Sequence, residues 1–264
     1  MTTGYQTIEL DVDDRGIAAL TLARPEKHNA LNALMIAELT DAAGCLVTDE
    51  AIRAVILGSR GLTFCAGGDL RWMGDQAARD RPGKLEGALE LSRMLQALDE
   101  LPKPLIGRVQ GNAFGGGVGI ISVCDIVVAT DLCQFALTET RLGLIPATIG
   151  PYVVRRIGEG AARRLLLSGQ QFSAETAREI GLLSMVCPTE DLDRRIADQA
   201  ALFLECAPGA VAATKRLVRQ LARQEFTDPA SQTAGLLADR WESAEGRTGI
   251  EAFLARRPMP WTKG

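Results

Sequence analysis

The stretch that decides the fold is Gly111-Asn-Ala-Phe-Gly-Gly-Gly-Val-Gly119, which follows the apolar run Leu105–Val109. A second stretch of the same kind, Phe64-Cys-Ala-Gly-Gly-Asp-Leu70, comes after the apolar run Ala54–Leu57. Short apolar runs predict buried strands, and the glycines lie where each strand should give way to a helix. Glycine allows close backbone approach there, and the first N–H groups of a helix have no partner within it. If the two stretches converge, they present two N–H donors to one oxygen, which is the geometry of an oxyanion hole.

Other interpretations of the two glycine stretches remain open at this point. Each stretch alone also fits a tight turn. A dinucleotide-binding loop is a poorer interpretation, because Gly115, Gly117 and Gly119 do not make the pattern G-x-G-x-x-G. The sequence contains no G-K-[ST], which excludes a phosphate-binding P-loop.

The remaining chain predicts an α/β fold followed by helices. Alternating apolar residues at 8–12 and a second apolar run at 17–22 indicate a hairpin, and Asn32 is expected to cap the helix after it. Strand signals stop near residue 190, and the segments 192–206, 210–223 and 229–245 each predict a helix. We therefore expect a core at residues 1–190 and a helical region at 191–264 that packs on the core or on another subunit.

The composition narrows the classes of function. Of the 264 residues, 47% are apolar and 23% charged, as in ordinary globular proteins, and the net charge of −4 argues against a nucleic-acid partner. No run of 18 apolar residues or secretory signal is present, so we expect a cytoplasmic protein with no membrane partner. His28 is the single histidine and lies in a polar loop, and the six cysteines form no C-x-x-C pair, so we expect no metal site.

Glu139 is a candidate for proton transfer, because it lies between apolar stretches. Burial there would raise its pKa toward the range that is useful for proton transfer. A surface glutamate paired with Arg141 is an equally good interpretation from the residues alone.

Seven segments, in this order, resemble the enoyl-CoA hydratase/isomerase (crotonase) family, and they extend over nearly the whole chain. Each is weakly specific by itself, whereas their order and spacing are highly specific. They are Arg24-Pro-Glu-Lys-His-Asn-Ala-Leu31, Phe64-Cys-Ala-Gly-Gly-Asp69, Gly111-x-Ala-x-Gly-Gly-Gly117, Cys124-Asp-Ile126, Glu139-x-x-Leu-Gly143 with Pro146, Ala177-x-x-x-Gly181-Leu182, and Glu245-Gly246 with Ala252-Phe253.

The resemblance implies a crotonase-like spiral of ββα units with a C-terminal helical trimerisation region, assembled as trimers or pairs of trimers. It also implies acyl-CoA thioester substrates, with coenzyme A as part of the substrate and no further cofactor. By family position the oxyanion donors are the N–H groups of Gly68 and Gly116. Typical hydratases carry two glutamates, whereas here Gly119 stands at the first position and Glu139 at the second. We expect the glycine to leave space for a branched acyl group.

Three functions follow from this pattern. The segment 135–153 is similar to hydratases that act on 3-methylglutaconyl-CoA or isohexenylglutaconyl-CoA, which favours hydration of a branched glutaconyl substrate. The single glutamate is typical of a Δ3,Δ2-enoyl-CoA isomerase, which moves one proton through a dienolate. A non-catalytic acyl-CoA-binding protein is the third alternative, because one acid is absent.

The resemblance also implies which residues contact the substrate, although each cation taken alone is better explained as a solvated surface charge. A glutaconyl carboxylate would favour a bidentate arginine, and the sequence does not choose among Arg141, Arg155 and Arg156. The residues implied for the acyl-CoA are Lys27, with Arg24 beside it, Ala66, Asp69, Arg71, Pro146, Lys215 and Phe253.

Overall fold

A computed structural model describes residues 4–262, and its larger sheet has six strands. Strands β1 and β2 form the expected antiparallel hairpin, and each later strand pairs in parallel with the one before it in the sheet. In sheet order the strands are β1 (Ile8–Val12), β2 (Ile17–Leu22), β3 (Ala54–Ser59), β5 (Leu105–Val109), β7 (Ile126–Thr130) and β10 (Met185–Cys187).

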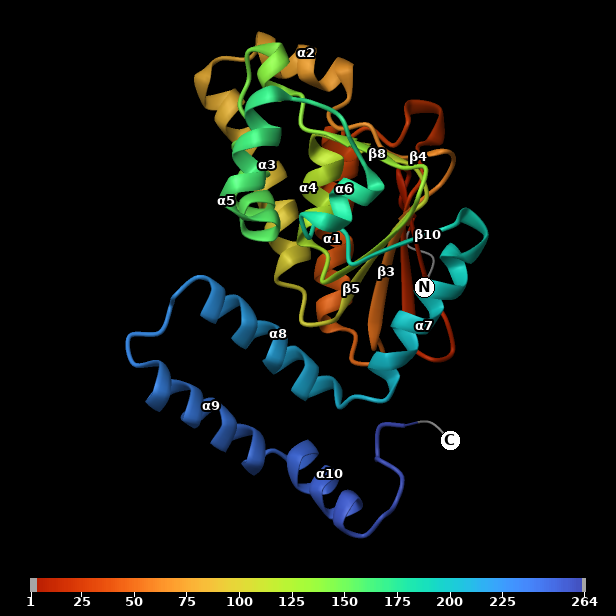
Figure 1. Ribbon diagram of the computed structural model, residues 1–264, viewed down its shortest axis with the longest axis vertical. Coiled ribbons are helices and arrows are strands. Elements are labelled where there is room, and N and C mark those ends of the chain that lie inside the picture. Colours follow the sequence, from red (N-terminus) through yellow and green to blue (C-terminus); the bar gives the residue numbers. More distant parts are fainter. Residues whose placement is uncertain (1–3, 263–264) are drawn as a thin grey trace.

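A smaller sheet contains β4 (Thr63–Cys65), β6 (Asn112–Phe114), β8 (Gln134–Ala136) and β9 (Phe172–Ser173). The consecutive pairs β3–β4, β5–β6 and β7–β8 each place one strand in each sheet, in the same order. Each pair is followed by one or more helices, so the chain advances as a spiral of ββα units (Figure 1). The predicted α/β spiral is therefore confirmed.

The helices of the body cover both faces of the larger sheet. Asn32 caps the first of them, because its side chain accepts the N–H of Met35, as expected. The helices of the body are α1 (Ala33–Thr48), α2 (Leu70–Ala78), α3 (Arg81–Asp99), α4 (Gly116–Val123), α5 (Gly150–Ser168), α6 (Ala174–Glu179) and α7 (Leu192–Leu204), with 3₁₀ turns η1 (Pro25–Lys27), η2 (Glu139–Leu142) and η3 (Thr189–Asp191).

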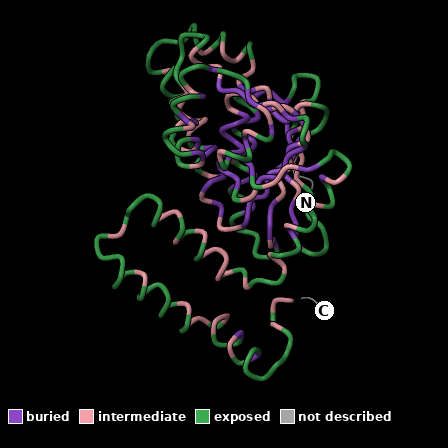
Figure 2. The backbone as a smooth tube through the Cα atoms, in the orientation of Figure 1, coloured by how far each residue is buried: buried purple, intermediate pink, exposed green. Residues whose placement is uncertain are grey.

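The core lies in two layers, which Figure 2 shows as the buried centre of the body. Residues such as Leu39 of α1 and Leu95 of α3 are fully buried against one face of the larger sheet. Leu192, Ile196 and Ala200 of α7 pack on its other face. Burying each large apolar side chain stabilises the fold by about 1.5–3 kcal/mol.

The last three helices extend away from the body as an arm (Figure 1). They are α8 (Pro208–Ala222), α9 (Pro229–Glu242) and α10 (Ala244–Leu254). The single helix predicted for 229–245 is wrong, because extended backbone at Ser243 ends α9, and the Ser243 side chain then accepts the N–H of Gly246 to cap α10.

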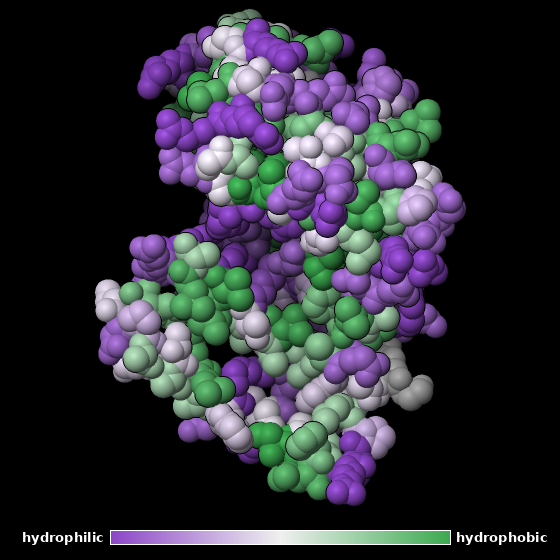
Figure 3. Space-filling model, in the orientation of Figure 1, coloured by the Kyte–Doolittle hydropathy of each residue, from purple (hydrophilic) through white to green (hydrophobic). Residues whose placement is uncertain are grey.

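The arm leaves large apolar side chains exposed on the single chain. Leu237 is 61% exposed, Trp241 58% and Leu254 75%, and Figure 3 shows hydrophobic surface over the arm. In the part of the chain that the structure describes, no single helix is long and apolar enough to cross a membrane, although the bent pair Thr189–Leu204 and Pro208–Ala222 passes on length and composition.

Candidate active site

The first glycine stretch is held by a short parallel bridge between Leu31 and Gly68. The N–H of Leu31 donates to the carbonyl of Gly67 at 2.7 Å, and the N–H of Asp69 donates to the carbonyl of Leu31 at 2.9 Å. Because the residues flanking Gly68 make both bonds, the N–H of Gly68 points away from Leu31. It donates to no other residue within the described range 4–262.

The second glycine stretch lies against the first. Gly115 has a φ of +47°, which favours glycine, and the next residue, Gly116, begins α4. The N–H of Gly116 is therefore one of the free donors of the helix start. A Cβ added to Gly67 would lie 3.7 Å from the backbone nitrogen of Gly116, so the two backbones pack without intervening side chains. The structure thus brings together the two predicted donor segments.

Glu139 lies at the start of η2, with its carboxylate beside the second glycine stretch. Its Oε1 is 3.1 Å from the position that a Cβ on Gly115 would take. Its Oε2 is buried and accepts no hydrogen bond from a described residue. Burial raises the pKa of Glu139, and the hydrogen bond from its own backbone N–H offsets only part of that effect. A carboxylate in this setting has the properties of a general base.

The alternative interpretation of Glu139 as a surface residue paired with Arg141 is wrong. Arg141 makes no ion pair with any residue that the structure describes, and its Nε lies 3.1 Å from the Cβ position of Gly169 instead. Glu139 is therefore left without a cationic partner, which is why desolvation dominates its pKa.

Gly119 does not open space for an acyl group, and that expectation is wrong. A Cβ added to Gly119 would lie 2.4 Å from Cγ2 of Ile149 and 3.9 Å from Cδ1 of Leu95. Ile149 is 2% exposed and Leu95 is fully buried. The space beside Gly119 is therefore filled by an apolar side chain that lies thirty residues later in the sequence.

A cavity of about 930 Å³ opens beside the first glycine stretch. The predicted residues Lys27, Ala66, Gly68, Asp69 and Arg71 all line it. Lys27 and Arg71 are exposed and make no ion pair with another described residue, so both cations remain available to phosphate groups.

Asp69 and Arg24 also line this cavity, but their charges are paired with each other. Oδ2 of Asp69 accepts Nη2 of Arg24 at 3.0 Å, and Oδ1 accepts the backbone N–H groups of Arg71 and Trp72. Burial of Asp69 disfavours its charge, but the hydrogen bonds from Arg24 and the two N–H groups outweigh it, so the pKa is lowered. Arg24 also donates to the carbonyl of Ala30 at 2.7 Å.

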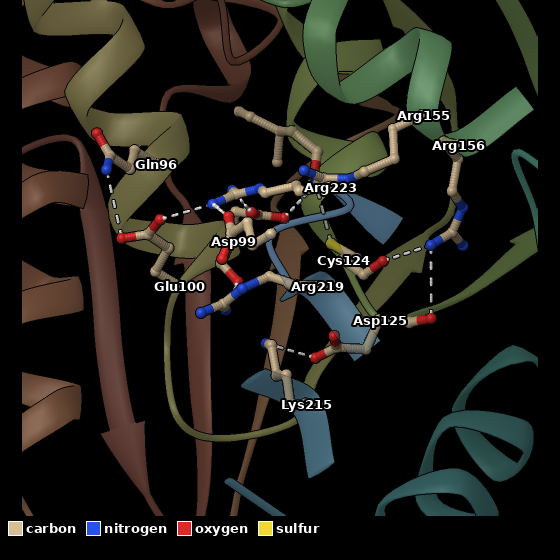
Figure 4. Close-up of polar contacts among 12 residues, drawn as sticks. Gln96, Asp99, Glu100, Cys124, Asp125, Arg155, Arg156, Lys215, Arg219 and Arg223 are labelled. Atoms are coloured by element: carbon tan, nitrogen blue, oxygen red, sulfur yellow. Dashed lines mark hydrogen bonds and ion pairs between the residues drawn. The ribbon is translucent and has the colours of Figure 1, made fainter. Parts of the chain in front are cut away.

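Three other predicted residues lie outside that cavity on the single chain. Figure 4 shows Lys215 of α8 directed at Asp125; its Nζ lies 2.6 Å from Oδ2 and also donates to the carbonyl of Lys103. Phe253 of α10 is 70% exposed and lines a separate hollow within the arm. Pro146 accepts the N–H of Gly150 at the start of α5.

The structure separates the three candidate arginines for a distal carboxylate. Arg155 pairs with Asp99, 2.5 Å from Nη2 to Oδ1, and Arg156 donates to backbone carbonyls that include Cys124 at 2.6 Å (Figure 4). Both guanidinium groups are therefore committed to the fold. Of the three, Arg141 makes no side-chain hydrogen bond or ion pair with a residue that the structure describes, and it is exposed.

Two features of the site were missed from the sequence. Ile149 was not singled out, because only packing shows that it fills the space of Gly119. Trp72 lines the cavity, with Cζ3 3.7 Å from the Cβ position of Gly68. The sequence signal that could have indicated Trp72 as a cavity residue was its position on a helix, one turn after the glycine stretch.

Comparison with known proteins places this site in a family. The enoyl-CoA hydratase/isomerase family model matches residues 13–264. The chain belongs to that family. The two adjacent glycine segments with their free N–H groups, and the carboxylate of Glu139 beside them, agree with this membership.

The similarity to relatives covers more than nine-tenths of this chain. A solved enoyl-CoA hydratase from Shewanella pealeana matches with a TM-score of 0.93 and 35% identity, over 98% of this chain and 97% of that chain. A Rhodobacter capsulatus protein named "Probable enoyl-CoA hydratase" is 34% identical over 98% of both chains. The 2,3-dehydroadipyl-CoA hydratase of Escherichia coli is 32% identical over 91% of this chain and 93% of its own.

Proposed function

We propose that this enzyme adds water across the α,β double bond of an acyl-CoA thioester. The observation that carries the proposal is the placement of Glu139 beside Gly115, next to the unpaired N–H groups of Gly68 and Gly116. The names of the hydratase relatives support the same reaction.

The proposed chemistry follows from the charge that develops on the thioester. When water adds at the β carbon, electrons move to the thioester oxygen, and two N–H donors stabilise the resulting enolate. Glu139 takes a proton from water and then supplies one to the α carbon. These groups complete the reaction without a metal ion or a nicotinamide, so we propose that coenzyme A enters only as part of the substrate.

For the substrate we propose a branched glutaconyl group, which ends in a carboxylate. The support is the similarity of segment 135–153 to glutaconyl-CoA hydratases. In addition, 2,3-dehydroadipyl-CoA, named for the Escherichia coli relative, carries a carboxylate at the end of its acyl group.

A Δ3,Δ2-enoyl-CoA isomerase is the second candidate, and Ile149 favours it. Because Ile149 fills the space beside Gly119, that position supplies no second carboxylate to hold water for Glu139. A single carboxylate suffices to move one proton between two carbons. A non-catalytic acyl-CoA-binding protein is the third candidate, and any turnover excludes it.

Assembly and location belong to the same proposal. The exposed apolar residues of α8–α10 support a homotrimer or a pair of trimers, because monomeric proteins rarely expose a large group of neighbouring apolar residues. The six free cysteines support a reducing, cytoplasmic location. The net charge of −4 supports the absence of a nucleic-acid partner, and we propose no membrane partner either.

One absorbance screen tests these candidates. Crotonyl-, 3-methylcrotonyl-, 3-methylglutaconyl- and 3-enoyl-CoA are each mixed with the enzyme, and the absorbance of the conjugated enoyl thioester is followed. Loss of absorbance, greatest for 3-methylglutaconyl-CoA, supports the hydratase. A gain with 3-enoyl-CoA alone shows the isomerase, and no change with any ester refutes both.

A further inference from the structure

Leu31 contacts the residues of both proposed oxyanion donors. Its backbone forms the parallel bridge with Gly68. Its side chain reaches the second donor, because Cδ1 of Leu31 lies 2.8 Å from the position that a Cβ on Gly116 would take. Apart from the neighbours of Gly116 in the chain, the next nearest residue is Gly67, with its Cα 3.9 Å from that position. One leucine therefore lies between the two segments whose N–H groups are proposed to meet at one oxygen.

Strand pairing alone does not fix the distance between the two donors. β4 and β6 pair in parallel, and Cys65 with Ala113 is the last pair in their register. Gly68 and Gly116 each lie three residues beyond that pair. Within the described part of the chain, no backbone hydrogen bond joins residues 66–69 to residues 114–118. The separation of the two N–H groups therefore depends on packing, and Leu31 makes the closest contact at the second one.

Leu31 faces the interior rather than the cavity beside it. Its exposed fraction is 1%, and it belongs to the main apolar core. Ala30 and Asn32, on either side of it, both line the cavity of about 930 Å³. Leu31 therefore makes no contact with a molecule bound there, and any effect that it has on the reaction must pass through the backbone of the two glycine stretches.

The loop that carries Leu31 is held in place by Asn29. The Asn29 side chain is fully buried, and its oxygen and its nitrogen both have partners. Oδ1 accepts the backbone N–H of Arg24 at 2.9 Å. Nδ2 donates to the carbonyls of Arg60 and Thr63, both at 2.8 Å. These bonds attach the loop to β4, the strand that leads into the first glycine stretch, so Leu31 packs on the second stretch from a fixed position.

We propose that Leu31 is a positioning residue that sets the separation of the two oxyanion donors. The inference rests on the proposed function, because it takes the N–H groups of Gly68 and Gly116 as the donors. The backbone of Leu31 holds the first segment, and its side chain holds the second at a fixed distance. Hydrogen bonds weaken steeply away from their preferred geometry, so a shift of either segment reduces the stabilisation of the enolate.

The contact predicts that two substitutions compensate for each other. The backbone of Gly116 is helical, so Gly116→Ala is strained chiefly where its Cβ meets Leu31. We expect Gly116→Ala to lower kcat about 10- to 100-fold, short of the complete loss of one oxyanion donor. Leu31→Ala removes Cδ1, retains the backbone bridge and should lower kcat about 5- to 30-fold by leaving the second segment unsupported. In the double variant the new methyl group occupies the space that the leucine leaves, so kcat should recover about tenfold over Gly116→Ala alone.

Leu39→Ala is the matched control, because Leu39 is a fully buried leucine on α1. Both leucine substitutions should lower the Tm, since each leaves a cavity in the core. Only Leu31→Ala should lower kcat. Leu31→Met, which nearly conserves volume, should retain most of the activity, and it keeps the test available if Leu31→Ala does not fold. An equal loss of kcat in Leu39→Ala, or additive losses in the double variant, would overturn the proposal.

A binding measurement separates failure of this inference from failure of the proposed function. Cinnamoyl-CoA, a conjugated thioester, is bound to Glu139→Gln, alone and combined with the Leu31 and Gly116 substitutions. Hydrogen bonds to its carbonyl polarise the conjugated system and move its absorbance to longer wavelength. The shift should fall by about half with Leu31→Ala and return when Gly116→Ala is added, while Kd changes less than about threefold.

The two outcomes that matter are distinct. If the parent turns over no ester but the absorbance shift follows this pattern, the proposed reaction fails and the positioning role of Leu31 stands. If the shift is absent, or is the same with and without Leu31→Ala, Leu31 does not set the donors and the inference is overturned, whatever the enzyme turns over.

Discussion

Glu139→Gln is the substitution that most directly tests the site, because it changes the chemistry while retaining the shape. Glutamine has the same length as glutamate, so it can occupy the contact beside Gly115. It cannot take up a proton. The two backbone donors at Gly68 and Gly116 are untouched, so acyl-CoA should still bind.

The size of the effect follows from the isolation of the carboxylate. Gly119 carries no side chain and Ile149 fills the space beside it, so no carboxylate at that position replaces Glu139. We therefore expect the full value of a positioned general acid or base, about 10²- to 10⁴-fold in kcat. That factor corresponds to roughly 3–5 kcal/mol of transition-state stabilisation. KM should change little.

The free energy of unfolding of Glu139→Gln should stay the same or rise, although its activity falls. Burial raises the pKa of Glu139 above its ordinary value of 4.5, so the folded protein holds this proton to a higher pH than the unfolded chain does. The free energy of unfolding therefore falls as pH rises through the window between the two values, and the lost stability is not regained above it. Glutamine has no proton to lose, so the variant should be at least as stable as the parent at neutral pH.

The assay combines turnover with denaturation. The kcat of both proteins is measured on the best ester of the absorbance screen, and urea unfolding is followed at pH 4.5 and pH 7.5. The stability difference should grow in favour of Glu139→Gln at the higher pH. Turnover near the parent rate, with parental unfolding, would refute the single-carboxylate site.

Three further predictions concern the pocket wall, the cavity and the arm. Gly119→Glu should lower the free energy of unfolding by about 1–3 kcal/mol, because its Cβ meets Ile149. Adding Ile149→Ala should restore part of that stability in thermal melts, whereas additive losses from the two substitutions would contradict the contact. Lys27→Ala and Arg71→Ala should each raise KM for acyl-CoA about fivefold with kcat unchanged, as expected for loss of about 1 kcal/mol from an exposed charge pair. An unchanged KM in initial-rate kinetics would count against a contact of either cation with the substrate. Leu237→Asp should convert the assembled enzyme to single chains in sedimentation, and a parent that is already a single chain would disprove the assembly.

Much of the site could be predicted because its decisive groups are backbone groups next to glycine. A strand that ends in glycines predicts free N–H donors wherever the chain runs next, and the contact between Gly67 and Gly116 agrees with that expectation. Burial of Glu139 was one of two interpretations that the sequence left open, and the structure decided in its favour. By contrast, Trp72 carries no local signal of an unpaired N–H, since a tryptophan on a helix is usually only a core residue.

The sequence by itself determined the hairpin and the cap at Asn32, because these depend on residues within a few positions of one another. Only the tertiary structure decided which side chains meet. Ile149 fills the space of Gly119, and Lys215 pairs with Asp125 ninety residues away. The physical reason is that such contacts are chosen by the packing of whole elements, which places residues together without regard to their separation along the chain.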